Sequence, residues 1–270
     1  MATFQLHAAL TTPFRADGAV DLEALRAHVE LLADDGIDGI VPAGTTGEGP
    51  LLEEAEVANV IATAVQAAAG RMEVVAHVGR ASTPATLRLA RAAAGAGADA
   101  VIAIVPYYYA HPPEALLSHY RALLGAVKDI PVLAYTFPDR AGNELPPEVL
   151  DTLAGEGLAG LKDSTRSPER HTEYLDVARR HEGLRVFVGS ERLALSSLAG
   201  GGAGSISALA NARADVLLRV RDERSDAAQE AVNDAHAGLS GIPAVKRAVA
   251  GRLAERGAAY PVASRAPVGV

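Results

Sequence analysis

The sequence predicts an α/β protein of the (β/α)8 TIM-barrel class with a C-terminal helical extension, and three observations support this prediction. Short apolar runs alternate with longer amphipathic segments, which is the pattern of parallel strands joined by helices. The apolar runs number eight, the strand count of a closed barrel. The first strand-to-helix turn, Thr11-Thr12-Pro13-Phe14, has no glycine, whereas a nucleotide-binding doubly wound sheet, the structural alternative, needs glycines there.

The predicted strands are three to six residues long and end at turns that contain polar residues or glycine. Strands of a parallel barrel are buried on both faces, so their sequences are mostly apolar rather than alternating. In chain order, the runs cover residues 5–9, 39–41, 73–78, 100–105, 131–135, 158–161, 185–188 and 203–206.

Between the strands, apolar residues recur at helical spacing. Asp21 is a predicted N-cap, because an aspartate precedes the first apolar residue of such a series. Thr83-Pro84 begins another helix, with proline at its first turn. A further helix is predicted after Leu52, where apolar residues recur from Val57 to Ala64, and others are predicted over residues 114–127, 147–153, 167–180 and 192–198.

The last part of the chain predicts helices rather than a second globular domain. From Asn211 the pattern is helical to Gly257, and a proline-containing tail follows from Tyr260. No linker interrupts it. We therefore predict a barrel over residues 1–210, and helices and a tail over residues 211–270 that pack on the barrel.

Composition limits the classes of function. The chain has 270 residues, 49% of them hydrophobic, and a formal net charge of −8. That charge argues against a nucleic-acid partner, since duplex binding relies on neutralising phosphates with Lys and Arg. There is no cysteine, which excludes thiolate metal sites and disulfides. No signal peptide or membrane-spanning run is visible, so we expect a cytoplasmic protein with no membrane partner.

In a barrel of this class, functional residues follow the carboxyl ends of the strands. Lys162 ends the sixth apolar run, and a lysine becomes a nucleophile when burial lowers its pKa toward neutrality. Gly44-Thr45-Thr46-Gly47 follows the second strand and can offer N–H groups and hydroxyls to a carboxylate or phosphate. The same sequence could also be an ordinary glycine turn, and it lacks the lysine of a P-loop.

Two more strand ends carry polar or aromatic groups. Tyr107-Tyr108-Tyr109 follows the fourth strand and is either a packing or interface patch or a functional group. After the fifth strand, Tyr135 could relay protons and Arg140 could bind a carboxylate, although a buried tyrosine and a solvated arginine are equally ordinary. Asp163 should point away from Lys162, because neighbouring strand residues face opposite sides. The eight histidines are scattered, so no metal site is expected.

Together these segments resemble the dihydrodipicolinate synthase / N-acetylneuraminate lyase family. The resemblance covers nearly the whole chain, in the family's order, and its matching segments are Gly44-Thr45-Thr46-Gly47-Glu48, Pro106-Tyr107-Tyr108, Tyr135-x-x-Pro138-x-Arg140-x-Gly142, Gly160-Leu161-Lys162-Asp163-Ser164, Gly201-Gly202-x-Gly204-x-Ile206-Ser207 and Ile242-Pro243-x-Val245-Lys246.

The resemblance implies a class I aldolase that needs no metal or organic cofactor. Lys162 would form a protonated imine with pyruvate, whose enamine then adds to an aldehyde. Thr45 and Thr46 would hold the pyruvate carboxylate, with Gly47 and Ile206 as further substrate-binding residues. Tyr135 would shuttle protons. Thr45 would link it to Tyr108 of a neighbouring subunit, which implies a homo-oligomer, either a dimer or a tetramer.

The identity of the aldehyde has two candidates. Arg140 matches the arginine that holds aspartate semialdehyde in the synthase branch, which makes a dihydrodipicolinate synthase the first prediction. Thr136 and Ala141 depart from that branch's Asn and Thr, and Gly47-Glu48-Gly49-Pro50 resembles 2-keto-3-deoxy sugar acid aldolases. A non-catalytic carboxylate-binding barrel is the remote alternative. No histidine follows Glu48 where a lysine-feedback site would need it, so lysine inhibition is not predicted.

Overall fold

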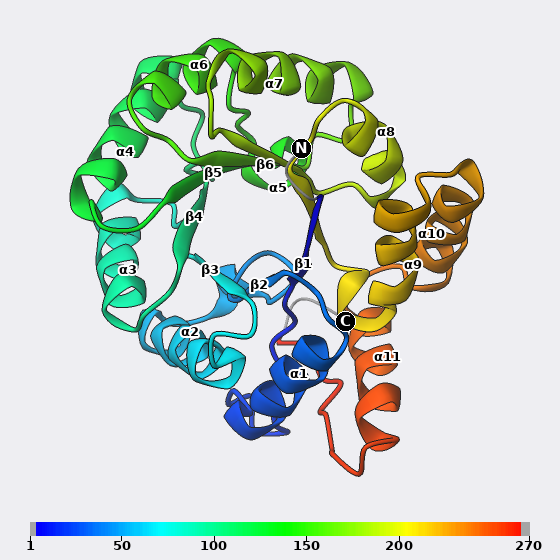
Figure 1. The fold of residues 1–270 in the computed structure, drawn as a ribbon. Helices are drawn as coiled ribbons and strands as arrows, with labels where there is room; N and C mark the ends of the chain where they lie inside the picture. The colour runs from blue at the N-terminus through cyan, green and yellow to red at the C-terminus, as the bar shows by residue number, and fades with distance from the viewer. Residues whose placement is uncertain (1–3, 266–270) are drawn as a thin grey trace.

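The computed structural model describes residues 4–265. In this part of the chain, eight parallel strands form one closed barrel in chain order, and β8 pairs with β1. The helices surround the strands as an outer layer (Figure 1). The predicted (β/α)8 class is therefore confirmed. The strands are β1 (Gln5–Ala9), β2 (Gly39–Val41), β3 (Glu73–His77), β4 (Ala100–Ile104), β5 (Val132–Thr136), β6 (Gly160–Asp163), β7 (Arg185–Val188) and β8 (Gly204–Ser207).

The strands are apolar because both of their faces are covered. Every residue of β4 and β5 is buried, by the barrel interior on one side and the helices on the other. Five of the eight strands differ from the predicted ranges by one or two residues at one or both ends, and the shift in β6 matters most. This strand begins two residues late, because Gly157 turns the chain with a φ of +102°. It continues through Lys162, which pairs with Tyr135 and with Phe187.

Two helix starts that the sequence predicted are confirmed. Asp21 Oδ1 accepts a hydrogen bond from Ala24 N at 3.1 Å, and Pro84 lies in the first turn of its helix. The helices are α1 (Leu22–Asp34), α2 (Glu54–Ala68), α3 (Thr83–Gly95), α4 (Pro113–Ala126), α5 (Pro138–Ala141), α6 (Pro147–Gly155), α7 (Pro168–Arg180), α8 (Ala194–Ala199), α9 (Ala210–Glu223), α10 (Asp226–Gly238) and α11 (Ile242–Ala254), with 3-10 turns η1 (Gly49–Leu51) and η2 (Glu191–Leu193).

The C-terminal extension consists of α9, α10, α11 and the segment after them. Helix α11 lies against α1, and Figure 1 shows the chain after α11 turning back toward the barrel. Leu31, Val249, Leu253 and Tyr260 share a small hydrophobic cluster at this contact, and Arg252 forms a bidentate ion pair with Asp35 at 2.6 and 2.7 Å. Within residues 4–265, no helix is long and apolar enough to cross a membrane.

Candidate active site

Lys162 lies at the carboxyl end of the barrel, on β6, with its side chain directed into the mouth of the barrel. It is only 7% exposed, and its Nζ atom lies 4.5 Å from the centroid of the Tyr135 ring on the adjacent strand β5. Gly189, just after β7, leaves room for this side chain. A Cβ atom on Gly189 would lie 3.2 Å from Lys162 Cε and 2.2 Å from Ser164 Oγ, so the close packing around the lysine requires a glycine there.

The predicted anion-binding turn forms the wall next to Tyr135. Thr45 Oγ1 and the Tyr135 hydroxyl are 3.3 Å apart. The loop closes on itself through Gly49 N, which donates to Gly44 O at 2.9 Å. Gly49 must be a glycine, since a Cβ atom there would lie 1.9 Å from Ala43 O. The loop therefore holds its two threonines in one arrangement at the cavity wall.

A cavity of about 660 Å³ opens above Lys162. Six of the eight residues that the sequence singled out line it, namely Thr45, Thr46, Tyr135, Arg140, Lys162 and Ile206. Gly47 does not. Gly47 is a buried residue of this loop, and its carbonyl accepts a hydrogen bond from Thr12 Oγ1 at 2.7 Å.

Tyr108 is also absent from this cavity within the single chain. It is 84% exposed, its ring contacts that of Tyr109 with centroids 4.9 Å apart, and its backbone is held at φ +82°. Such a conformation is costly for a residue other than glycine and is often found at functional positions. The sequence associated Tyr108 with a neighbouring subunit, and this remains a prediction.

A smaller, mostly apolar cavity of about 270 Å³ adjoins the first one. Thr45, Arg140 and Ile242 line both cavities, while His77 and Tyr107 line only the smaller one. Burial, together with the positive charges of Arg80 and Lys162, lowers the pKa of His77 to about 3. His77 is therefore a neutral imidazole at physiological pH.

The sequence analysis missed the cavity residues that follow β7. Glu191 is buried, and its Oε1 atom accepts a hydrogen bond from Ser207 Oγ at 2.7 Å. Its Oε2 atom lies 3.5 Å from His236 Nδ1, and Arg192 lines the same wall. The strand-end rule that found Lys162 also applies to Gly189-Ser190-Glu191-Arg192, so the signal was present in the sequence.

Behind Lys162, a buried polar network holds the end of β6. Asp163 faces away from the cavity, as strand alternation predicted. Its Oδ2 atom lies 2.8 Å from His171 Nδ1, and its Oδ1 atom accepts hydrogen bonds from the backbone and hydroxyl of Thr165 at 2.8 and 2.7 Å. His171 Nε2 lies 2.9 Å from Ser197 Oγ. The network joins β6 to α7 and α8.

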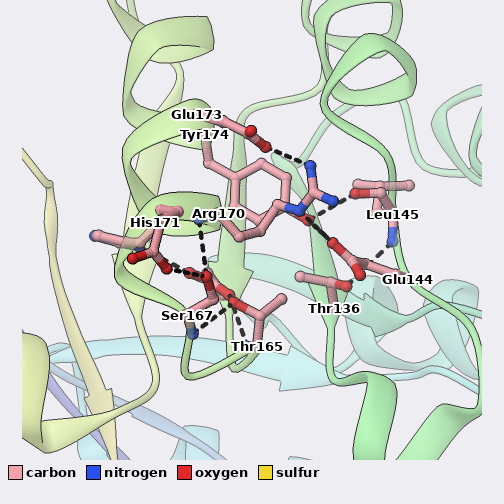
Figure 2. Close-up of polar contacts among 11 residues, drawn as sticks. Thr136, Glu144, Leu145, Thr165, Ser167, Arg170, His171, Glu173 and Tyr174 are labelled. Atoms are coloured by element: carbon pink, nitrogen blue, oxygen red, sulfur yellow. Dashed lines mark hydrogen bonds and ion pairs between the residues drawn. The ribbon is translucent and has the colours of Figure 1, made fainter.

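Figure 2 shows how α7 also holds the segment that follows Arg140. Arg170 pairs with Glu144 at 2.5 Å, and the Tyr174 hydroxyl donates to Leu145 O at 2.7 Å. Leu145 N in turn donates to Thr136 Oγ1 at 3.1 Å. Thr136, where the family has asparagine, therefore accepts a backbone hydrogen bond. That bond joins the end of β5, which precedes the short helix α5, to the segment after this helix, and α5 carries Arg140.

Comparisons with known proteins agree with this geometry. A 4-hydroxy-tetrahydrodipicolinate synthase of Chlorobium luteolum is 38% identical over 231 residues, which is 84% of this chain and 77% of that protein. An uncharacterized DapA-like lyase of Halobacterium salinarum is 35% identical over 87% of this chain and 78% of its own. The crystal structure of dihydrodipicolinate synthase from Aquifex aeolicus superposes with a TM-score of 0.87 at 29% identity, covering 99% of this chain and 92% of that one. The sequence profile of the dihydrodipicolinate synthetase family matches residues 3–246, and the chain therefore belongs to that family.

Proposed function

We propose that this protein is a 4-hydroxy-tetrahydrodipicolinate synthase that condenses pyruvate with aspartate semialdehyde through an imine on Lys162. One observation carries the proposal. The Lys162 amine, the Tyr135 ring at 4.5 Å and the Tyr135–Thr45 contact at 3.3 Å lie together at the base of one cavity. A nucleophile, a proton carrier and an anion-binding loop are the parts that imine chemistry on a keto acid needs.

The reaction begins with attack of the Lys162 amine on the C2 carbonyl of pyruvate. Hydroxyls of Thr45 and Thr46 and N–H groups of their loop bind the pyruvate carboxylate and orient the carbonyl. The Tyr135 hydroxyl supplies a proton to the carbinolamine oxygen, which leaves as water. The product of this half-reaction is a protonated imine between Lys162 and pyruvate.

The protonated imine then acts as the electron sink. Tyr135, which gave up its proton in the first step, accepts the proton that leaves C3. The resulting enamine attacks the aldehyde carbon of the second substrate, a carbon–carbon bond forms, and Tyr135 returns the proton to the aldehyde oxygen. Arg140 lines the cavity and can bind the carboxylate of the semialdehyde. The amino group of the new chain finally displaces Lys162 from the imine carbon, which closes the ring and restores the free amine.

Trapping the imine tests this proposal directly. The chain contains three lysines, Lys128, Lys162 and Lys246, so an adduct is easily assigned by mass spectrometry. Treatment with pyruvate and borohydride should label Lys162 alone, and Lys162→Ala should remain unlabelled. Folded protein without a label on Lys162, or with equal labelling of Lys128, would contradict the proposal.

A sugar-acid aldolase that uses the same imine is the second candidate. The observation in its favour is Glu191, a carboxylate on the cavity wall that can accept hydrogen bonds from the hydroxyls of a polyhydroxy aldehyde. Aspartate semialdehyde and glyceraldehyde should be compared as acceptors at saturating pyruvate. A kcat/KM at least about tenfold higher for the semialdehyde is expected, and the opposite order would favour the aldolase.

We further propose that the enzyme works in the cytoplasm as a homo-oligomer in which Tyr108 of one subunit serves the site of another. The support is the exposed, strained Tyr108 and the cavity of about 270 Å³ beside Thr45, which has room for an aromatic ring. Mixing two inactive variants, Lys162→Ala and Tyr108→Phe, tests it. Mixed oligomers would contain sites with an intact lysine and an intact partner tyrosine, so activity should return, whereas a tyrosine acting within its own subunit predicts no recovery.

A further inference from the structure

A buried ion pair lies behind the Thr45–Thr46 loop. Glu48 Oε1 and Lys246 Nζ are 2.5 Å apart, and both side chains are fully buried. Glu48 belongs to the loop, whereas Lys246 belongs to α11, far away in the sequence. Charges without solvent persist in a protein only where they are paired and hydrogen-bonded, so this contact fixes the loop to the C-terminal extension.

The segment after α11 completes the environment of both charges. Lys246 Nζ also donates to Ala263 O at 2.8 Å, and Arg265 N donates to Glu48 Oε2 at 2.8 Å. The two oxygens of the Glu48 carboxylate are therefore held separately, one by helix α11 and one by the segment that follows it.

The Arg265 side chain fastens this segment to the barrel. Its guanidinium group forms a bidentate ion pair with Glu56 of α2 at 2.6 and 2.7 Å. It also donates to Leu51 O at 2.9 Å and to Gly18 O at 2.6 Å. Earlier in the same segment, the Tyr260 hydroxyl lies 2.7 Å from Thr11 Oγ1. These contacts bring residues 260–265 back across the loop that follows β2.

The backbone of Glu48 transmits this attachment to the two threonines. Glu48 has a φ of +55°, a left-handed conformation that costs a residue with a Cβ atom about 1 kcal/mol. Its N–H donates to Thr45 O at 3.1 Å, which closes the turn that contains Thr46. Because the turn is short and closed, a change in the position of Glu48 also moves Thr45 and Thr46.

We infer that Lys246 and residues 263–265 form a C-terminal latch that positions the pyruvate-binding loop through Glu48. Lys246, Glu48 and Arg265 are thus positioning residues, because they act on the substrate only through Thr45 and Thr46. The inference rests on the proposed function, in which that loop binds the pyruvate carboxylate. It assigns the end of the chain a role in substrate affinity rather than in stability alone.

The test measures how much pyruvate is needed to label Lys162. A chain that stops after Val262 lacks both Ala263 O and Arg265 N, so its loop should be mispositioned. We expect the half-saturating pyruvate concentration for the borohydride-trapped adduct to rise about tenfold or more. The KM for aspartate semialdehyde should stay within about twofold of the wild type, because Arg140, which binds that substrate, makes none of the latch contacts described above.

Arg252→Ala is the matched control. It removes a bidentate ion pair of the same helix α11, at the opposite end from Lys246 and with no contact to the loop. We expect it to lower the melting temperature without changing the pyruvate requirement. A rise in the pyruvate requirement as large as that of the truncated chain would overturn the inference, since it would show that any loosening of α11 has the same effect.

Arg265→Ala gives a second measurement if the truncated chain does not fold. It leaves the backbone N–H of residue 265 in place but removes the fastening to Glu56, so a smaller rise of about threefold is expected. An unchanged pyruvate requirement in the folded variant would overturn the inference. Wild-type protein that forms no adduct at all would instead contradict the proposed function, so the two failures can be distinguished.

Discussion

The two ends of the barrel both carry charged and polar side chains, but they use them differently. At the amino end, Glu73 begins β3 and Arg185 begins β7, on opposite sides of the barrel. Arg185 binds Glu73 in a bidentate ion pair at 3.1 and 3.2 Å, and His7 Nε2 lies 2.8 Å from Glu73 Oε2. At the carboxyl end, the described part of the chain has a single hydrogen bond within the group Lys162, Tyr135 and Thr45. It joins Thr45 Oγ1 and the Tyr135 hydroxyl at 3.3 Å.

The two ends differ in how many of their hydrogen-bonding groups are already paired within the protein. At the amino end, Arg185 and His7 engage both oxygens of Glu73, so this carboxylate stabilises the fold and has little capacity left for a ligand. The carboxyl-end groups face a cavity and keep hydrogen-bonding capacity for a substrate, as active sites of this fold do. We therefore expect substitutions at the amino end to change stability, and substitutions at the carboxyl end to change catalysis.

Lys162→Met should have the largest effect, and it should be catalytic. Loss of the nucleophile should lower kcat by at least about 10⁴-fold, which corresponds to roughly 5.5 kcal/mol of transition-state stabilisation. The free energy of unfolding should stay within about 1 kcal/mol of the wild type, since a nearly buried charge is replaced by an apolar chain of similar length. Urea denaturation and steady-state kinetics measure the two quantities. A large loss of stability would show that the carboxyl end also supports the fold.

Arg185→Met should have the opposite profile. Removing one partner leaves the Glu73 carboxylate poorly compensated. We expect a loss of about 3 kcal/mol of unfolding free energy, the low end of the range for buried pairs, because both side chains keep some contact with solvent. The kcat and both KM values should be unchanged well below the melting temperature. Adding Glu73→Gln should recover part of the lost stability, because the double variant has no uncompensated charge. A catalytic defect in folded Arg185→Met would break the comparison between the two ends.

Lowering the pH should remove the stabilisation that the same amino-end pair provides. Burial opposes ionisation of Glu73, but the hydrogen bonds from His7 and Arg185 outweigh it and lower the pKa to about 2. Because this pKa is lower in the folded state, the stabilisation is complete above the ordinary value near 4.5 and is lost as the pH falls toward 2. The shift corresponds to about 3 kcal/mol.

The measurement is the difference in unfolding free energy between the wild type and Glu73→Gln at several pH values. That difference should shrink by about 3 kcal/mol between pH 5 and pH 2. Other groups also titrate in this range. Burial lowers the pKa values of His28 and His77 to about 3, but both proteins contain these histidines, so their contributions cancel in the difference. A difference that does not change with pH would mean that the Glu73 pair adds little to the amino end.

Local patterns were enough to predict the barrel. Apolar runs predict the strands, and the residues that follow each run are expected at the carboxyl ends of the barrel strands. The sequence alone therefore predicts that Lys162, Tyr135 and Thr45 lie at the same end of the barrel. Boundaries were less certain, because the end of β6 depends on pairing with β5 and β7 rather than on its own residues. Helix α5 was missed, since its four residues, Pro138–Ala141, are too few to show periodicity.

The supports behind the site could not be predicted in this way. Glu48 and Lys246 are 198 positions apart, and Asp163 reaches Ser197 only through His171. Such pairs form when the closed barrel brings distant segments together, and no local spacing signals them. Glu191 is different, because it follows a predicted strand end and was open to prediction. Local sequence thus predicts the groups that can react with substrate better than the groups that hold them.

Two tyrosine substitutions make the smallest and sharpest comparison, since each removes a single hydroxyl. Tyr135→Phe removes the hydroxyl next to Thr45, and kcat should fall about 100-fold, as expected for a lost proton carrier, with little change in stability. Tyr120→Phe removes a hydroxyl that donates to Ala103 O at 2.9 Å in the core. That change should cost about 1 kcal/mol of stability and leave kcat unaltered. Comparable kcat losses in both variants would mean that the Tyr135 hydroxyl acts through packing, and its proposed role in proton transfer would have to be abandoned.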